Sequence, residues 1–473
     1  MRIKNFICTL ILISSSLFTA QGQTEKRYSL EECISIALKN NLELKSSRFR
    51  EQSATINFKQ SKANLLPNVN GSYNIGVNNG RSIDPFTNDF INQKLTFSNA
   101  NLNLNAVIFN GFRLLNSVKQ QKMNAKAANL EVEQEKQNLV LSVTLAYLQV
   151  LNSRDVLELN EQRLTATKNQ LKIQKDLYDE GRSNPADYTD LLGQETIDET
   201  SILSSKIQLN NAKLSLARLL NLDGEVHVNE SSMLLSLGKY NLSSDEVYQQ
   251  ALNGLATFKA RELRVEAAKK GINVARAQYI PEVSVFGQLN TNYSSAAETF
   301  TQIGSSIVET GDFVEVNSQN IPVLREQNEF SSKQIPYLDQ FENNLNSVMG
   351  VSVRVPLFNG FRAKNNVALE KLKVEESLVE LERTQVEIKN TIKQVHFDME
   401  AAFARYQSFQ KQVAAFERSF QVNETRFNSG VSNFLAYITS KNNLESAKIN
   451  LSNAKYAYVL RVKVLEYYRG QVF

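Results

Sequence analysis

The phrase "IFNGFR" at Ile108–Arg113 returns as "LFNGFR" at Leu357–Arg362, each time between an alternating apolar run and a 69-residue stretch without glycine or proline. At ~1.5 Å per residue, such a stretch would be about 100 Å long as one helix. Asparagine can cap a new helix, and glycine adopts backbone angles that other residues resist. In isolation Asn-Gly is more typical of a hairpin turn. Here the long stretch that follows favours a strand-to-helix corner at Asn110, Gly111, Asn359 and Gly360.

The repeated phrase belongs to a duplication that covers most of the chain. A shift of 214 residues places Pro67 on Pro281, and a shift of 249 residues places Gly181 on Gly430. The change of shift predicts one insertion in the second half, at about residues 290–344. We therefore expect two repeats, 23–235 and 236–473. Each begins with one long helical pattern, which a proline ends because proline cannot continue a helix; the patterns are Leu30–Leu66 and Ser243–Ile280.

Residues 1–22 are typical of a cleaved secretory signal. Arg2 and Lys4 precede an apolar run from Phe6 to Phe18, and small residues follow near Gly22. The run is too short for a stop-transfer helix. Cleavage would remove Cys8 and leave Cys33 as the single cysteine, so we expect no intrachain disulfide.

The charge balance and the hydropathy pattern exclude two classes of protein. Lys and Arg total 53 against 49 Asp and Glu, which is too even a balance for the concentrated positive field of a nucleic-acid binder. Beyond the signal there is no run of 18 apolar residues. If the mature chain enters a membrane, it must do so as strands.

Four short segments alternate between apolar and polar residues, which predicts strands. After Pro67, the stretch "NVNGSYNIGV" places Val69 and Tyr73 on one face, and "EVSVFGQL" follows Pro281. Before the repeated phrases, the apolar faces consist of Leu102, Leu104, Ala106 and Ile108 in one half and Val351, Val353, Val355 and Leu357 in the other. The alternation alone fits both a soluble sandwich and a membrane barrel.

The long glycine-free stretches carry a coiled-coil seam. In the second half, apolar residues recur at spacings of four and three, at Ile388, Ile392, Val395, Met399, Ala402, Tyr406, Phe409, Val413, Phe416 and Phe420. The first half keeps most of this seam, with polar interruptions at Ser153, Asn160 and Thr167. A soluble coiled-coil rod would explain the seam, but it would not explain four alternating strands.

Four strands per chain cannot close a barrel, because the smallest barrels have about eight, and open edges are not tolerated in lipid. Several copies would have to share one barrel. Two copies would supply eight strands and three copies twelve, and only the larger barrel leaves room for an aqueous lumen.

The duplicated order of helix, strand pair, "LF-x-G" corner, long helix, Gly-containing turn and returning helix resembles the TolC family of outer-membrane efflux proteins over essentially the whole mature chain. The resemblance implies an α+β membrane protein that forms a homotrimer. Its four strands per chain would build a 12-stranded barrel in the outer membrane of a Gram-negative bacterium, above a helical tunnel in the periplasm. The implied partners are a periplasmic adaptor (membrane fusion) protein and an inner-membrane transporter of RND, ABC or MFS type.

The resemblance also implies roles for the turns after the long helices. The adaptor-docking tips map onto Gly181, Arg182, Ser183 and Asn184, and onto Gly430, Val431, Ser432 and Asn433. A D-x-x-D pattern at the tip constriction matches Asp187 and Asp190, but the second half has Ala436 and Thr439 there. Plain turn chemistry is the alternative for the tips. For the two acids, the alternative is that acidic residues complement the dipole of a first helical turn.

No catalytic, cofactor or metal site is legible in the sequence. His227 and His396 have no metal-ligand spacing, and no nucleophile or P-loop motif is present. The function predicted is a passive exit duct for an efflux or type I secretion system, whose cargo could be a drug, a metal or a protein. The alternative is a secreted coiled-coil scaffold with a small soluble sheet. We expect the polar insertion to be an extracellular loop, although a lid is also compatible.

Overall fold

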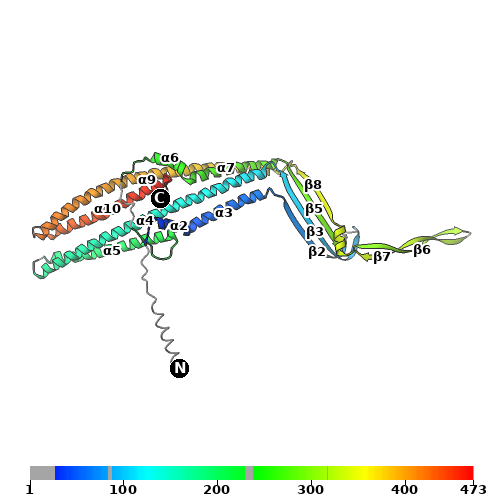
Figure 1. Cartoon of the computed structure of the whole chain (residues 1–473), viewed down its shortest axis with the longest axis horizontal. Helices are drawn as coiled ribbons and strands as arrows, with labels where there is room; N and C mark the ends of the chain where they lie inside the picture. Colours follow the sequence, from blue (N-terminus) through cyan, green and yellow to red (C-terminus); the bar gives the residue numbers. More distant parts are fainter. Residues whose placement is uncertain (1–26, 84–87, 183, 230–237, 317, 472–473) are drawn as a thin grey trace, which may run out of the picture. The chain divides into compact units, whose positions relative to one another are not determined.

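The computed structural model describes residues 27–83, 88–182, 184–229, 238–316 and 318–471 (Figure 1). The predicted signal, residues 1–22, the boundary between the predicted repeats and Ser183 lie outside the described residues. The chain forms two compact units, described here one at a time. Unit 1 contains residues up to 54, 124–265 and 376–473, and unit 2 contains residues 55–123 and 266–375.

Unit 1 is helical. Its helices, some of which continue into unit 2, are α2 (Leu30–Asn40), α3 (Leu42–Ala63), α4 (Arg113–Asp179), α5 (Pro185–Leu220), α6 (Ser244–Gly254), α7 (Ala256–Arg276), α9 (Arg362–Asn428) and α10 (Phe434–Tyr468). A short parallel pair joins β1 (Arg27–Tyr28) to β4 (His227–Val228). The two long helices that the glycine-free stretches predict, α4 and α9, are each 67 residues long. They form helical hairpins with α5 and α10.

The single helix predicted at the start of each half is wrong in one respect, because each pattern is broken into two helices. Asn41 and Leu255, which are 214 residues apart, have extended backbones. The Asn41 side chain accepts a hydrogen bond from the Leu44 N–H at 3.0 Å and so restarts the helix. Leu255 follows Gly254, and glycine weakens a helix. In both halves, a capping box opens the first helix, with Ser29 and Ser243 as the N-caps.

The seam predicted for α9 faces the interior of unit 1, because all ten of its residues are buried or half-buried. Ile392 and Met399 pack with Val247 of α6 and Leu465 of α10. On α4, Leu139 and Val143 belong to a second core with Leu216 of α5. Burial of these side chains stabilises each helix by about 1.5 to 3 kcal/mol per fully buried residue.

Unit 2 contains an antiparallel sheet in the order β2-β3-β5-β8. Its strands are β2 (Asn68–Ile83), β3 (Phe90–Phe109), β5 (Glu282–Ser294) and β8 (Asn346–Arg354). The register confirms the predicted alternation, because the predicted apolar face of β2 lies beside that of β3 and the asparagine-rich faces lie together. Val69 pairs with Leu104, for example, and Asn70 with Asn103.

The last strand is shorter than predicted. We expected the alternation to continue through Val355 and Leu357, but β8 ends at Arg354. Pro356 has no N–H with which to continue the ladder. The neighbouring strand β5 also begins at Glu282, opposite Arg354, so no partner backbone extends further.

The predicted insertion folds as a hairpin and a short helix. Among the described strands, β6 (Glu298–Val316) and β7 (Gln319–Gln334) pair only with each other, and α8 (Tyr337–Asn343) follows. The ends of the hairpin are adjacent, since the Ile335 N–H donates a 3.0 Å hydrogen bond to the Ala297 carbonyl. Among the described residues, no helix combines the length and the apolar character needed to cross a membrane.

Candidate functional site

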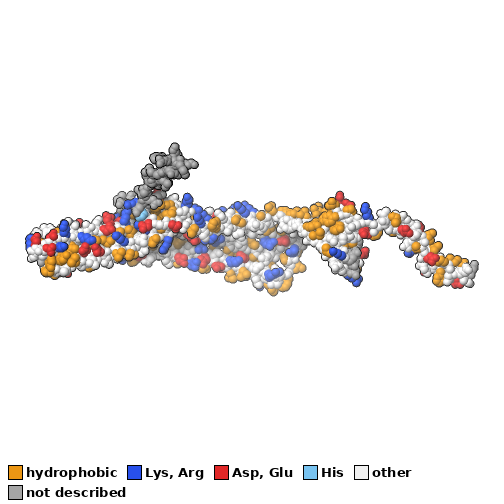
Figure 2. All heavy atoms as spheres, turned by 90° about the horizontal axis from the view of Figure 1, so that it is seen from below, with side chains coloured by type: hydrophobic (Ala, Val, Ile, Leu, Met, Phe, Trp, Pro, Cys, Tyr) orange, Lys and Arg blue, Asp and Glu red, His pale blue; other side chains and the backbone are white. Residues whose placement is uncertain are grey.

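One face of the four-stranded sheet is apolar and exposed. Tyr73 of β2 is 56% exposed, and Val351 and Val353 of β8 are 65% and 61% exposed. Figure 2 shows hydrophobic side chains gathered over this part of the surface. The opposite face carries polar pairs such as Asn70 with Asn103 and Ser284 with Ser352. A soluble sheet buries its apolar face, so an exposed apolar face beside a polar one suits lipid on one side and water on the other.

Aromatic residues lie at both ends of the apolar face. At the helix end, Phe109 packs edge-on against Phe112 at 5.4 Å between ring centroids, and Phe358 packs against Phe361 at 5.6 Å. At the other end, the ring of Tyr337 in α8 contacts Tyr293 and Phe341. Aromatic girdles of this kind mark the two membrane interfaces of outer-membrane barrels. The phenylalanines of the repeated phrase occupy the position that one such girdle has in these barrels.

The four corner residues lie where strands give way to long helices. Asn110 and Gly111 connect β3 to α4, and Asn359 and Gly360 precede α9. The Asn110 Oδ1 accepts from the Leu114 N–H at 3.3 Å, and the Asn359 Oδ1 accepts from the Ala363 N–H at 3.5 Å. Both glycines are left-handed, with φ of 65° and 62°. The phenylalanine that follows each glycine is left-handed too, so each corner requires two consecutive residues with positive φ.

The two sets of tip residues lie at the same end of unit 1. Gly181 and Gly430 have φ of 72° and 73°, and Asn184 and Asn433 cap α5 and α10 through bonds to the N–H groups of residues 186 and 436. A small core beneath the tips joins all four helices, with Leu191, Phe434 and Tyr437 as its buried members. Arg182 forms an ion pair with Glu180 at 3.0 Å. Val431 is 69% exposed.

The two acids of the D-x-x-D pattern lie close to each other in the first turns of α5. Asp187 is half-buried and Asp190 is exposed. Burial raises the pKa of the Asp187 carboxyl, and the negative charge of Asp190 raises it further. The equivalent positions on α10, Ala436 and Thr439, carry no charge. The D-x-x-D pair is therefore present on the first hairpin and absent from the equivalent positions of the second.

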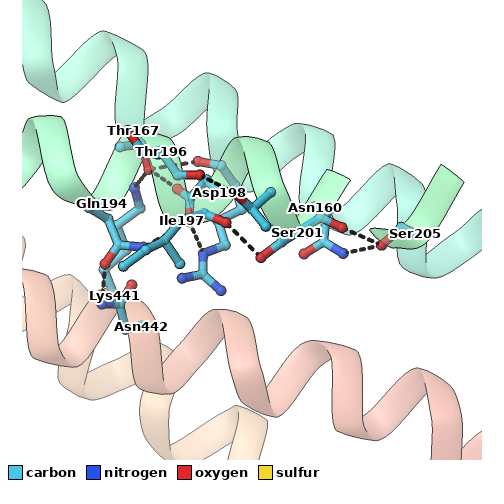
Figure 3. A network of polar contacts seen from close by, with 12 residues as sticks. Asn160, Thr167, Gln194, Thr196, Ile197, Asp198, Ser201, Ser205, Lys441 and Asn442 are labelled. Carbon is cyan, nitrogen blue, oxygen red and sulfur yellow. Dashed lines mark hydrogen bonds and ion pairs between the residues drawn. The ribbon is translucent and has the colours of Figure 1, made fainter. Parts of the chain in front are cut away.

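A buried ionic cluster lies next to the tips in unit 1 (Figure 3). It was not predicted from the sequence. Asp198 of α5 has a fully buried side chain, and its Oδ1 lies 2.7 Å from the Arg163 Nε of α4. The Lys441 Nζ of α10 donates to the Thr167 hydroxyl at 2.7 Å, and this hydroxyl donates to the Asp198 Oδ2 at 2.5 Å. Gln194 donates to the same carboxylate at 2.8 Å.

This cluster joins α10 of the second half to the α4–α5 hairpin of the first. Burial lowers the pKa of the Lys441 ammonium, and the charge of Asp198 opposes that shift. Asn442 adds a 3.0 Å bond to the Gln194 side-chain oxygen. The sequence signal for the cluster was the set of polar interruptions in the seam, because Thr167 lies in the cluster and Asn160 bonds to Ser205 nearby at 2.7 Å.

The histidines take part in local contacts. The His396 ring shares a 2.9 Å hydrogen bond with the Leu242 carbonyl, and His227 lies 3.6 Å from Glu225. Within the described ranges, no group of three His, Cys, Asp or Glu residues is placed to hold a metal ion. Cys33 is a free thiol that is fully buried.

Comparisons with known proteins agree with this arrangement. The family model described as "Outer membrane efflux protein" matches the chain twice, at residues 33–222 and 247–470. The chain is 22% identical to the outer membrane efflux protein BepC of Brucella suis, over 97% of this chain and 88% of the relative. It is 20% identical to the outer membrane protein TolC of Vibrio cholerae, over 92% of this chain and 89% of that protein.

Its fold is similar to that of a CusC crystal structure, with a TM-score of 0.73 at 18% identity over 96% of this chain and 95% of that one. These matches confirm the predicted fold and favour the efflux channel over the coiled-coil scaffold. The chain belongs to the outer membrane efflux protein family, whose members are channel proteins of the outer membrane.

Proposed function

We propose that three copies of this chain form a passive exit duct, in which a shared 12-stranded barrel crosses the outer membrane and the long helices enclose a periplasmic tunnel. The sheet carries this proposal, because it exposes a continuous apolar face and keeps a polar one opposite. A periplasmic adaptor and an inner-membrane transporter would supply cargo and energy. The chain itself would conduct without catalysing a reaction.

The edges of the sheet support an assembly. Strands β2 and β8 each have one neighbour in the sheet, so each presents an unpaired row of N–H and C=O groups. Such groups cost several kcal/mol each in lipid. Pairing β8 of one copy with β2 of the next removes both edges, and three copies provide enough strands for an aqueous lumen.

Disulfide crosslinking tests this pairing directly. Ser352 of β8 would be replaced by cysteine together with one β2 residue at a time from Asn68 to Asn74, because the register between copies must be scanned. Within one chain, β3 and β5 separate these strands. A correct cysteine pair should give disulfide-linked dimers and trimers on non-reducing gels. Each single-cysteine variant should give no linked species larger than a dimer. Because the native Cys33 is fully buried, it should not form crosslinks of its own. A scan without any linked trimer would refute the shared barrel.

We propose further that Gly181, Arg182, Ser183 and Asn184, with Gly430, Val431, Ser432 and Asn433, form the docking surface for the adaptor. The exposed Val431 side chain at a turn supports this role. We also propose that Asp187 and Asp190 form carboxylate rings at the constriction, that residues 1–22 are a cleaved signal, and that the repeats span 23–235 and 236–473.

Replacing Val431 with Asp tests the docking role. The variant should weaken adaptor binding, measured by co-purification, and leave the conductance of the channel in planar bilayers unchanged. Leu338 of α8, which is similarly exposed, provides the matched control as Leu338→Asp. Equal adaptor binding by the wild type and the Val431 variant would remove that residue from the docking surface.

A further inference from the structure

A polar cavity of about 490 Å³ lies in unit 2, at the two strand-to-helix corners. Both copies of the repeated phrase contribute to it with the same two residue types. Asn110 and Arg113 come from the first copy, and Asn359 and Arg362 come from the second. Glu282 and Arg354, from the facing ends of β5 and β8, complete its charged lining. Each arginine of the repeated phrase forms one local bond at its corner, which leaves further N–H donors of both guanidinium groups facing the cavity's other residues.

The cavity has an excess of positive charge, with three guanidinium groups against one carboxylate. One terminal nitrogen of Arg113 forms an ion pair with the Glu282 carboxylate at 3.0 Å. The Arg362 Nε donates a hydrogen bond to the Asn359 carbonyl at 3.2 Å. Its two terminal nitrogens remain available for another acceptor. Within the described part of the chain, the Arg354 guanidinium forms no hydrogen bond or ion pair, and only the backbone of Arg354 takes part in the sheet. Guanidinium groups in such a setting bind oxyanions through paired N–H donors.

A second observation points to the same kind of occupant. Asn110 is 6% exposed, and its Oδ1 caps α4, yet its Nδ2 is buried without a hydrogen-bond partner. A buried donor without an acceptor is costly and rare. The cavity also adjoins the first turns of α4 and α9, whose backbone dipoles favour negative charge.

We propose that this cavity binds an oxyanion of the phosphate type, held by Arg113, Arg354 and Arg362. The cavity lies on the polar face of the sheet, because Glu282 and Arg354 share a face with Ser284 and Ser352 in the register. In the channel of the proposed function, on which this step rests, that face borders water. Free phosphate or a phosphate-bearing solute therefore suits the cavity better than a lipid headgroup does.

The test is equilibrium binding of radiolabelled inorganic phosphate to the full-length mature protein in maltoside detergent. The wild type should bind one phosphate per chain. Arg354→Gln should weaken that binding by about tenfold or more, because one charge-assisted donor pair is lost. The Arg354 side chain is exposed and its guanidinium forms no bond within the described residues, so its replacement should not disturb folding. Arg325→Gln removes a matched exposed charge from β7 and should leave binding unchanged.

A second arm identifies the source of the phosphate group. Phospholipid that co-purifies with the wild type, is lost in Arg354→Gln and is displaced by free phosphate would support the cavity with a lipid headgroup as its occupant. If the wild type holds neither phosphate nor such lipid, or if both variants weaken binding equally, the proposal is overturned. Conductance of the same preparations separates the two proposals, because a conducting channel that binds no phosphate refutes the cavity and leaves the duct intact.

Discussion

At the scale of single residues, the buried ionic cluster is asymmetric. The Asp198 carboxylate forms an ion pair with Arg163 at 2.7 Å and is linked to the Lys441 ammonium through the Thr167 hydroxyl. Asp198→Asn would leave buried Arg163 without its ion pair and Lys441 with Glu445 as its remaining acidic neighbour, so we expect it to cost about 3 to 5 kcal/mol of stability. Lys441→Met keeps the Arg163–Asp198 pair and most of the packing volume. We expect that variant to lose roughly 1 kcal/mol or less.

Denaturant unfolding of the purified assembly, followed by circular dichroism, would measure both changes. An Asp198→Asn and Lys441→Met double variant serves as a control and should not recover wild-type stability, because Arg163 stays unpaired. Equal losses in the two single variants would show that the carboxylate does not organise the cluster.

The corner glycines provide a second prediction at this scale. A Cβ at Gly111 would meet the Ile280 Cβ at 2.7 Å, whereas one at Gly360 would meet nothing within 4 Å. Both positions have positive φ, so alanine costs about 1 to 2 kcal/mol at either. Gly111→Ala should cost roughly 1 to 3 kcal/mol more because of the clash. The same unfolding assay compares the pair, and a Gly360→Ala variant that is the less stable of the two would contradict the assignment.

At the scale of elements, the β6–β7 hairpin is an accessory to the sheet. It pairs only with itself, and the hydrogen bond from Ile335 to Ala297 holds its two ends together. Replacing residues 298–334 with a short Gly-Ser turn should therefore preserve the assembly and its conductance. Gel mobility with and without heating and planar-bilayer recordings would check this. Loss of the heat-sensitive assembly would mean that the hairpin takes part in holding the copies together.

The order of the elements could be predicted because two strong periodicities mark it. Alternation identified the four strands, and the seam spacing identified α9. The hairpin could not be predicted, because register shifts near Gly304 and between Glu309 and Phe313 interrupt the alternation of β6. The break at Leu255 depends on one extended residue, which periodicity does not detect. Thr167 could be singled out as a polar seam position, but its partners on α5 and α10 depend on helix packing.

At the scale of the whole molecule, the acids near the tips predict how conduction depends on pH. The raised pKa of Asp187 means that its charged form is disfavoured in the folded tip. This unfavourable contribution is present at neutral pH and disappears as the pH falls through the raised pKa. Acid pH should therefore stabilise the tip and weaken its attraction for cations, so potassium conductance should fall by roughly a factor of two or more.

Single-channel recording from neutral to acid pH would measure this fall. A channel with both Asp187→Asn and Asp190→Asn should conduct less at neutral pH and respond little to acid. If this variant kept the full pH response of the wild type, the two acids would have no role in conduction.

The matched lengths of the helices constrain how such a protein can change. Helices α4 and α9 have 67 residues each, and α5 and α10 have 36 and 35. Removing one heptad from α4 alone would shorten that arm by about 10 Å and shift its side chains by two turns along those of its neighbours, although the seam would keep its face. Adaptation to a bacterium with a wider or narrower cell envelope would therefore require coordinated insertions or deletions of whole heptads in all four arms.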